Sequence, residues 1–181
     1  ALGSCRYKIA DPDEDEMDYK KILEIFKKYD VRYFFYNGGN DSMDTCHKVN
    51  ELAKKEGLEL RVIGIPKTMD NDLELTDHCP GFGSAARYAA LSAAELALDA
   101  SGLPIHVVVL ELMGRNAGWV TAASALAARL TDCQVLTYLP EVLVDEDKML
   151  ADIEKVYAKG KGLLVTVSEG ICGLDGKPLA D

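Results

Sequence analysis

The chain alternates between segments whose apolar residues recur every three or four positions and short apolar runs without this spacing. The first pattern predicts amphipathic helices, and the second predicts buried strands. The predicted helices cover residues 17–30, 42–57, 81–102, 117–130 and 146–160. The predicted strands cover residues 31–37, 60–66, 105–112, 134–140 and 162–170. This alternation predicts an α/β fold with three αβα layers and mostly parallel sheets covered on both faces.

The predicted elements form parts of two Rossmann-like lobes. A loop with proline and glycine, residues 75–83, precedes the long alanine-rich helix, so we place the lobes at residues 1–80 and 81–181. Helical spacing also predicts which side chains face the core. In the first two helices these are Tyr19, Ile22, Leu23, Phe26, Tyr29, Cys46, Val49, Leu52 and Ala53. In the fourth helix they are Trp119, Ala122, Ala123, Leu126 and Leu130.

Composition and charge narrow the possible functions. The chain has 181 residues, 48% of them hydrophobic, which is enough for a sizeable core. The net charge of −10 argues against a nucleic-acid or anionic membrane surface as partner. No apolar run of about 18 residues occurs, so no membrane span is predicted. A phosphate substrate would therefore need a local group of cations.

Five cysteines lie far apart without CxxC spacing. They indicate reduced thiols rather than a disulfide framework or a zinc site. The first residues turn acidic too early to resemble a secretory signal. We therefore expect a cytoplasmic protein.

Polar loops follow four of the predicted strands, with the sequences GGNDS, PKTMDND, MGRNAG and SEG. In parallel α/β sheets, ligands bind beyond the carboxyl ends of the strands. All four loops leave from that edge, which is therefore the predicted binding site.

Two glycines, Gly38 and Gly39, lead into the second predicted helix, which Asn40 and Asp41 immediately precede. A helix N-terminus favours anions, so Asp41 or Ser42 can be an ordinary cap. The same geometry can also hold a phosphate group beside a metal ion. The residues alone leave both interpretations open.

Residues 64–72, GIPKTMDND, contain the largest group of side chains that can bind phosphate or transfer a proton. Lys67 offers a compact cation for phosphate, and Thr68 adds a hydroxyl. Asp70 and Asp72 are two residues apart, so an extended loop would point both carboxylates to one side. One such carboxylate can accept the proton of a sugar hydroxyl that attacks phosphorus. The alternative is a turn in which Asp and Asn cap their own backbone.

Three further residues are ambiguous when taken singly. Arg115 precedes a helix and can bind phosphate together with backbone N–H groups, or it can be a surface arginine after a glycine turn. Glu169 follows a strand and can bind sugar hydroxyls or be a solvated acid. Arg6 lies three residues after Gly3 in LGSCR, and it can likewise bind phosphate or be a surface arginine.

Read in order, the segments LGSCR, GGNDS, PKTMDND, MGRNAGW and VSEG resemble the phosphofructokinases, and more closely their pyrophosphate-dependent branch. The resemblance runs from about residue 2 to residue 170. It implies phosphoryl transfer from pyrophosphate to the 1-hydroxyl of fructose 6-phosphate, giving fructose 1,6-bisphosphate, with Mg²⁺ as the cofactor. It also implies a homo-oligomer, a dimer or a tetramer, for the full protein.

The resemblance implies a role for each motif residue. Asp70 would accept the proton, and Thr68 and Met69 would line the sugar pocket. Asp72 would support the transferring phosphate and its metal. The sugar phosphate and its hydroxyls would be held by Met113, Gly114, Arg115 and Glu169. The donor would be bound by Arg6, Gly39, Asp41 and Lys67.

Asp41 and Lys67 bear on the identity of the donor, because ATP-using relatives carry glycine at these positions. A carboxylate at Asp41 would repel the α-phosphate of ATP, while Lys67 would neutralise pyrophosphate. Together with Asp70, these two residues form the predicted catalytic set. The alternatives are an ATP-dependent 6-phosphofructokinase and a non-catalytic regulatory subunit of the same family.

The chain departs from the family pattern in three ways. Asn40 stands where relatives have an aspartate associated with magnesium, which weakens the metal site because an amide brings no charge. His106 stands where many relatives have an arginine that contacts fructose 6-phosphate across a subunit interface. Relatives also extend beyond both ends, so we expect an internal piece that is inactive by itself.

Overall fold

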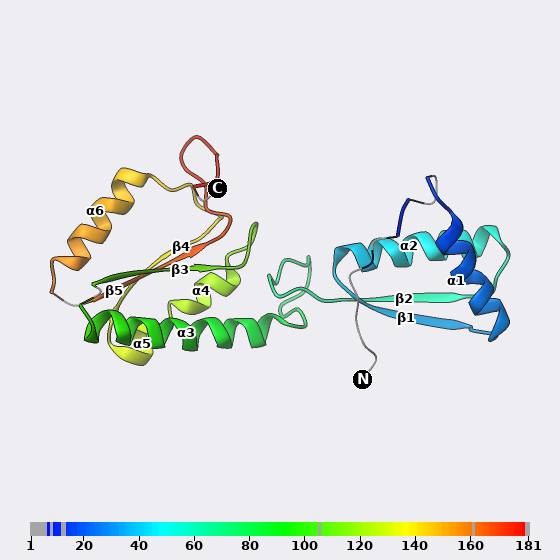
Figure 1. Cartoon of the computed structure of the whole chain (residues 1–181), viewed down its shortest axis with the longest axis horizontal. Helices are drawn as coiled ribbons and strands as arrows, with labels where there is room; N and C mark the ends of the chain where they lie inside the picture. The colour runs from blue at the N-terminus through cyan, green and yellow to red at the C-terminus, as the bar shows by residue number, and fades with distance from the viewer. Residues whose placement is uncertain (1–6, 8, 12–13, 105, 161, 180–181) are drawn as a thin grey trace. The chain divides into compact units, whose positions relative to one another are not determined.

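The computed structural model describes residues 7, 9–11, 14–104, 106–160 and 162–179 (Figure 1). They form two compact units, Ala1–Lys67 and Thr68–Asp181. The division after Lys67 comes earlier in the chain than the boundary predicted at residue 80. The loop that follows Lys67 belongs to the second unit because Thr68 pairs with Gly81 in an isolated β-bridge.

The first unit is built on two parallel strands, β1 (Tyr33–Gly38) and β2 (Arg61–Pro66). Helices α1 (Met17–Lys28) and α2 (Asn40–Lys55) pack on one face of this sheet. Successive strand side chains point to opposite faces, so alternate strand residues meet the helices. The buried core consists of Tyr19, Leu23, Val49, Leu52, Ala53 and Leu60.

Helical spacing predicted most of this core correctly. All the predicted core residues of α2 are buried, and so are Tyr19 and Leu23 of α1. The prediction for Tyr29 is wrong: its side chain is 67% exposed, because α1 ends at Lys28 and the chain turns away. On the other face of the sheet, the described part of the unit leaves large apolar side chains exposed: Tyr33, Phe35, Ile63 and Ile65.

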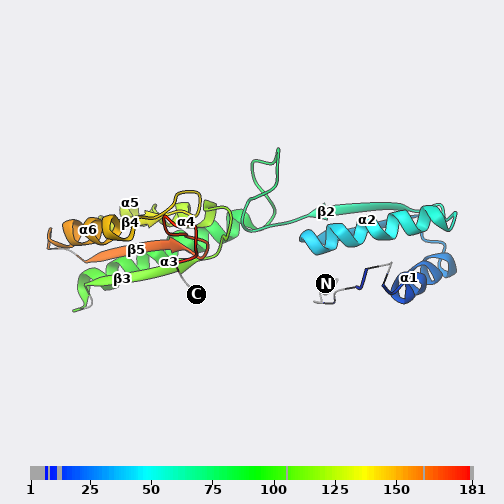
Figure 2. The same ribbon diagram turned by 90° about the horizontal axis from the view of Figure 1, so that it is seen from above.

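The second unit has a three-stranded parallel sheet in the order β3–β5–β4 (Figure 2). The strands are β3 (Val107–Leu112), β4 (Gln134–Tyr138) and β5 (Leu163–Ser168). β5 lies between the other two, and all of its residues are buried. A central parallel strand with no exposed position requires cover on both faces.

Helices provide this cover and complete three αβα layers (Figure 1). They are α3 (Phe82–Gly102), α4 (Trp119–Ser124) and α5 (Ala127–Thr131) on one face and α6 (Glu146–Tyr157) on the other. Leu164 packs on the α3 side, whereas Leu163 and Val165 pack on the α6 side. The predicted α/β fold with parallel sheets is confirmed.

The buried face of α3 consists entirely of alanines. Small side chains let neighbouring elements approach closely and still fill the interior. Neither α3 nor any other helix in the described ranges is long and apolar enough to cross a membrane.

The helix predicted over residues 117–130 is interrupted, and its core stripe is wrong. Trp119 is 55% exposed, and it lines an open hollow with Phe82 and Asp72. The buried positions are occupied by smaller side chains, Val120, Thr121, Ser124 and Ala127. Only small groups fit there, because α4 packs against the alanine face of α3.

Candidate active site

The turn after β1 and the residue after β2 lie side by side at the carboxyl edge of the first unit's sheet. The strand register pairs Gly38 with Pro66, and the Lys67 N–H donates to the Gly38 carbonyl at 2.9 Å. α2 begins immediately after this turn. The fold therefore brings together the described residues that were predicted to bind the donor and its metal: Gly39, Asn40, Asp41 and Lys67.

The two glycines of this turn have different surroundings. A Cβ at Gly38 would collide with the Ser42 hydroxyl, so β1 can meet α2 in this way only without a side chain there. A Cβ at Gly39 would meet no atom of the described chain within 4 Å. Gly39 thus leaves open space at the start of α2, where backbone N–H groups attract anions.

Asp41 and Lys67 are both exposed beside this space. Within the described residues, neither the Asp41 carboxylate nor the Lys67 ammonium makes a hydrogen bond or an ion pair. Asp44, by contrast, pairs with Lys48 at 2.8 Å. The N-cap of α2 is Gly39, with no side-chain hydrogen bond, so the interpretation of Asp41 or Ser42 as a cap is wrong.

In the second unit, the loop after Lys67 draws Asp70 partly into the interior. The Asp70 Oδ1 atom is buried and has no hydrogen-bond partner among the described atoms. The Asp70 N–H donates to Thr68 Oγ1 at 3.2 Å, which shapes the turn. Burial, followed by the charges of Asp72 and Glu169, raises the pKa of Asp70 above its ordinary value. A carboxylate with raised proton affinity and a free oxygen is suited to accept a proton.

Asn71 holds the same loop in shape. It is buried, and its φ of 58° lies in the left-handed region that asparagine tolerates. Its amide nitrogen donates to the Asp77 carbonyl at 3.1 Å, and its Oδ1 accepts the Cys79 N–H at 2.8 Å. Asn71 therefore bonds backbone groups six and eight residues later rather than capping its own turn, and the Asp70 Oδ1 atom caps nothing among the described residues.

β3 ends in a second glycine turn, residues 113–115. Gly114 is buried, and its φ of 128° favours glycine. Its N–H donates to Glu169 Oε1 at 3.3 Å, and its carbonyl accepts from the Ser168 hydroxyl. The side chains of Met113 and Arg115 remain exposed.

The predicted acceptor residues gather at the carboxyl edge of the second unit's sheet. Glu169 contacts the 113–115 turn, and its charge also acts on Asp70. The loop that holds Asp70 also carries Thr68, Met69 and Asp72, so the charge of Glu169 acts on the loop that carries these predicted pocket residues.

Sequence reasoning missed two residues that support this region, Ser168 and Glu141, and it considered Asn71 only as a cap of its own turn. Glu141 Oε1 accepts the Gly118 N–H at 2.7 Å, just before α4 begins. Asn71 and Ser168 lie inside the PKTMDND and VSEG segments, so their places beside Asp70 and Glu169 were a usable signal. Glu141 has no such signal, because only the fold brings it to the end of the MGRNAG loop.

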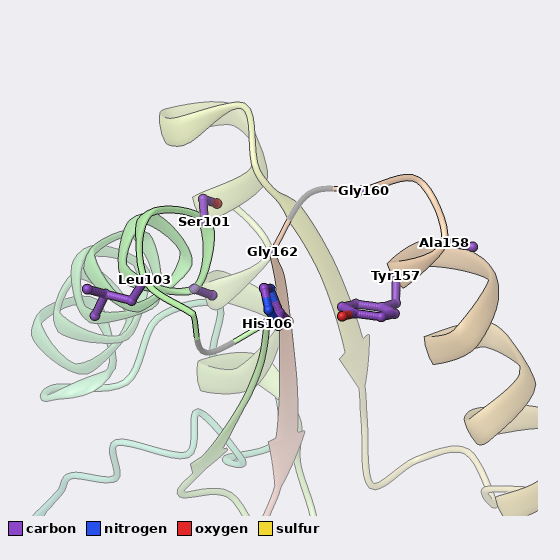
Figure 3. A pocket seen from close by; sticks show the side chains of 8 residues that line it. Ser101, Leu103, His106, Tyr157, Ala158, Gly160 and Gly162 are labelled. Atoms are coloured by element: carbon purple, nitrogen blue, oxygen red, sulfur yellow. The ribbon is translucent and has the colours of Figure 1, made fainter.

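His106 lies at the opposite end of β3 (Figure 3). Its ring meets Tyr157 edge to face, with the centroids 5.8 Å apart, in a cavity between the ends of α3 and α6. The six residues of β3 separate it from Met113. At the rise of a strand this is roughly 20 Å, so His106 does not reach the 113–115 turn of its own chain.

Arg6 lies outside the described residues. Within the described ranges, no group of three His, Cys, Asp or Glu side chains is placed to hold a metal ion. Carboxylate oxygens are the hard ligands that Mg²⁺ prefers, and the Asp70–Asp72 loop offers two carboxylates, one with an oxygen that has no hydrogen-bond partner among the described atoms. The chemistry of this loop fits Mg²⁺.

Known proteins of one family resemble this chain over nearly its whole length. The phosphofructokinase family model matches residues 1–180. The chain belongs to the phosphofructokinase family. A pyrophosphate–fructose 6-phosphate 1-phosphotransferase from Xanthomonas campestris pv. campestris (strain B100) is 46% identical over 100% of this chain and 44% of its own length. An ATP-dependent 6-phosphofructokinase from Amycolatopsis methanolica is 36% identical over 93% of this chain and 35% of its own.

A solved structure of the same family has the same fold. The pyrophosphate-dependent phosphofructokinase from Nitrosospira multiformis gives a TM-score of 0.83 at 45% identity, covering 97% of this chain and 44% of that one. This phosphofructokinase chain therefore spans about 44% of the length of the Xanthomonas and Nitrosospira proteins.

Proposed function

We propose that the full-length protein containing this chain transfers a phosphoryl group from pyrophosphate to the 1-hydroxyl of fructose 6-phosphate. The products are fructose 1,6-bisphosphate and inorganic phosphate. The observation that carries the proposal is Asp70, whose buried Oδ1 atom lacks a hydrogen-bond partner among the described atoms. Burial and the charges of Asp72 and Glu169 raise the pKa of its carboxyl. Relatives 46% identical to the chain bear the name of this activity.

On the acceptor side, Asp70 takes the proton of the 1-hydroxyl as that oxygen attacks phosphorus in line and phosphate departs. The raised pKa of Asp70 favours this proton transfer. Glu169 binds sugar hydroxyls with the oxygen that Gly114 does not occupy. Arg115 binds the sugar phosphate beside Met113 and Gly114, and Thr68 and Met69 line the sugar pocket.

On the donor side, Lys67, the open space at Gly39 and Arg6 bind pyrophosphate. The unpaired Asp41 carboxylate repels the α-phosphate of ATP, which would lie where Gly39 leaves room. Both charges are free of internal partners in the described chain, so both are available to a ligand.

The candidate ligands for Mg²⁺ are Asp72 in the second unit and, as a weaker, uncharged ligand, Asn40 in the first unit; each is proposed for its own unit. When bound, the ion neutralises the charge of the phosphate oxygens. We also propose that the protein works in the cytoplasm as a homo-oligomer, a dimer or a tetramer. His106 is shorter than the arginine of many relatives, so it weakens the contact that this arginine makes with fructose 6-phosphate across the subunit interface.

A donor swap tests the proposal. The full-length protein is assayed for fructose 1,6-bisphosphate with pyrophosphate or with ATP at matched concentrations. We expect turnover with pyrophosphate at least about tenfold faster than with ATP, the scale of one charge-assisted hydrogen bond. Faster turnover with ATP would establish the ATP-dependent alternative, and no turnover with either donor would favour the regulatory subunit.

A further inference from the structure

The last residue of β5, Ser168, and the two residues after it hold the 113–115 turn in place. The Glu169 N–H donates to the Leu112 carbonyl at 2.9 Å, which extends the β3–β5 ladder one residue beyond the end of β5. The Gly114 N–H donates to Glu169 Oε1, and the Gly114 carbonyl accepts from the Ser168 hydroxyl. A Cβ at Gly170 would collide with the Arg115 carbonyl, so the two backbones touch there.

Ser168 is the buried member of this set. Its exposed fraction is 0%, so water does not replace its hydroxyl when that group is removed. The Gly114 carbonyl is then left without its donor in a buried place, which is the costly way to lose a hydrogen bond. Glu169 is only half-buried and holds the other side of the same residue.

These contacts decide which way the Gly114 backbone faces. Glycine adopts positive and negative φ values about equally readily, so the residue itself does not select the observed φ of 128°. The two neighbours on β5 and after it select this conformation. The Ser168 hydroxyl donates to the Gly114 carbonyl, and the Glu169 carboxylate accepts from the Gly114 N–H, so both backbone groups must face these side chains. The directions of the Met113 and Arg115 side chains follow from this choice.

We propose that Ser168 is a positioning residue for the acceptor substrate. Its hydroxyl holds the Gly114 carbonyl, and this keeps Arg115 and Glu169 arranged to bind the sugar phosphate and its hydroxyls, while Ser168 itself touches no substrate. The inference rests on the proposed function for the identity of the ligand, and on geometry alone for the effect on the turn.

Ser168→Ala in the full-length protein tests the inference, with Thr166→Val as the matched control. Thr166 lies two residues earlier on β5, is equally buried, and uses its hydroxyl with Ser124 and Thr137 rather than with the turn. We expect Ser168→Ala to raise KM for fructose 6-phosphate about tenfold, the scale of one buried hydrogen bond. KM for pyrophosphate is expected to change less than about twofold, and Thr166→Val to leave both values in that range.

Hydrogen exchange of residues 113–118 gives a readout independent of turnover. Ser168→Ala is expected to speed exchange of the Gly114 amide, while Thr166→Val does not. Ser168→Thr keeps the hydroxyl, so we expect it to restore slow exchange and most of the affinity for fructose 6-phosphate. If the alanine variant does not fold, the threonine variant is compared with the wild-type protein instead.

Equal effects of Ser168→Ala and Thr166→Val on KM and exchange would overturn the inference. So would unchanged exchange of Gly114 in Ser168→Ala. If the wild-type protein shows no turnover, the proposed function fails, and the exchange comparison still decides whether Ser168 holds the turn.

Discussion

The turn at residues 38–41 leaves open space at Gly39, and the charged side-chain groups of Asp41 and the neighbouring Lys67 make no hydrogen bond or ion pair within the described residues. The turn at residues 113–115, by contrast, is held by the buried Ser168 and the half-buried Glu169. Both follow a parallel strand and both carry glycine. The first offers a ligand free charges and empty space. The second offers a fixed backbone, so its specificity is built into the core of the second unit.

This difference determines which residues can be substituted with little loss of folding stability and which cannot. Exposed charges with no internal partner can be replaced with little effect on folding. A buried turn cannot, because each of its contacts also stabilises the unit. Donor choice is therefore expected to vary more easily than acceptor binding in this chain.

The largest expected effect comes from Asp70→Asn, which removes the proposed proton acceptor from the second unit, the unit that also holds the buried 113–115 turn. We expect kcat of the full-length protein to fall about 10²- to 10⁴-fold, the contribution of a general base. Steady-state kinetics measure this. Turnover within a factor of about two of wild type would reject the role of Asp70.

The same variant is expected to be more stable at neutral pH. The pKa of Asp70 is raised in the folded state, so the folded form prefers the proton, and the ionised carboxylate costs stability above that pKa. The gain should shrink as the pH falls toward the unfolded value of about 3.9. Thermal unfolding between neutral and acidic pH measures it, with the exposed Asp77→Asn in the same loop as the control.

A matched glycine pair tests the comparison directly. Gly114→Ala forces a side chain into the left-handed region and against the Ala117 carbonyl, so we expect a loss of about 1–3 kcal/mol in the free energy of unfolding. Gly39→Ala meets no described atom, and about 1 kcal/mol or less is expected. Denaturant unfolding of both full-length variants decides. Equal losses would show that the two turns are held alike.

Donor choice is expected to follow Asp41 and Lys67. Changing both to glycine should reduce the preference for pyrophosphate over ATP by about 10- to 100-fold, since one repulsive and one attractive charge are lost. The free energy of unfolding should change by less than about 0.5 kcal/mol. Competition between the two donors in one assay measures the first quantity. An unchanged preference would remove these residues from donor selection.

The smallest expected effect is on the metal. Asn40→Asp adds a charged oxygen at the start of α2, where it also suits the helix N-terminus. We expect the Mg²⁺ concentration for half-maximal activity to fall a few-fold, while kcat stays within about twofold of wild type. A Mg²⁺ titration of the full-length protein measures this shift, and no shift would place Asn40 outside the metal site.

Much of this arrangement follows from the sequence. The alternation of apolar patterns determined the order of the elements, because helices and strands repeat their buried positions at different intervals. Parallel connection then placed the motif loops at the carboxyl edges of the sheets. The motif residues identified the family, whereas the core stripe at Trp119 and the exposed Tyr29 were misplaced.

The tertiary structure decided which polar atoms have partners. Asp70 and Asn71 are neighbours in one motif, yet Asn71 closes the loop while Asp70 keeps a buried oxygen free of described partners. Ser168 meets Gly114 across 54 positions of chain, and no local pattern encodes such a contact. The physical reason is that helical and strand periodicity depends on near neighbours, whereas burial and hydrogen bonding depend on whatever atoms the fold brings together.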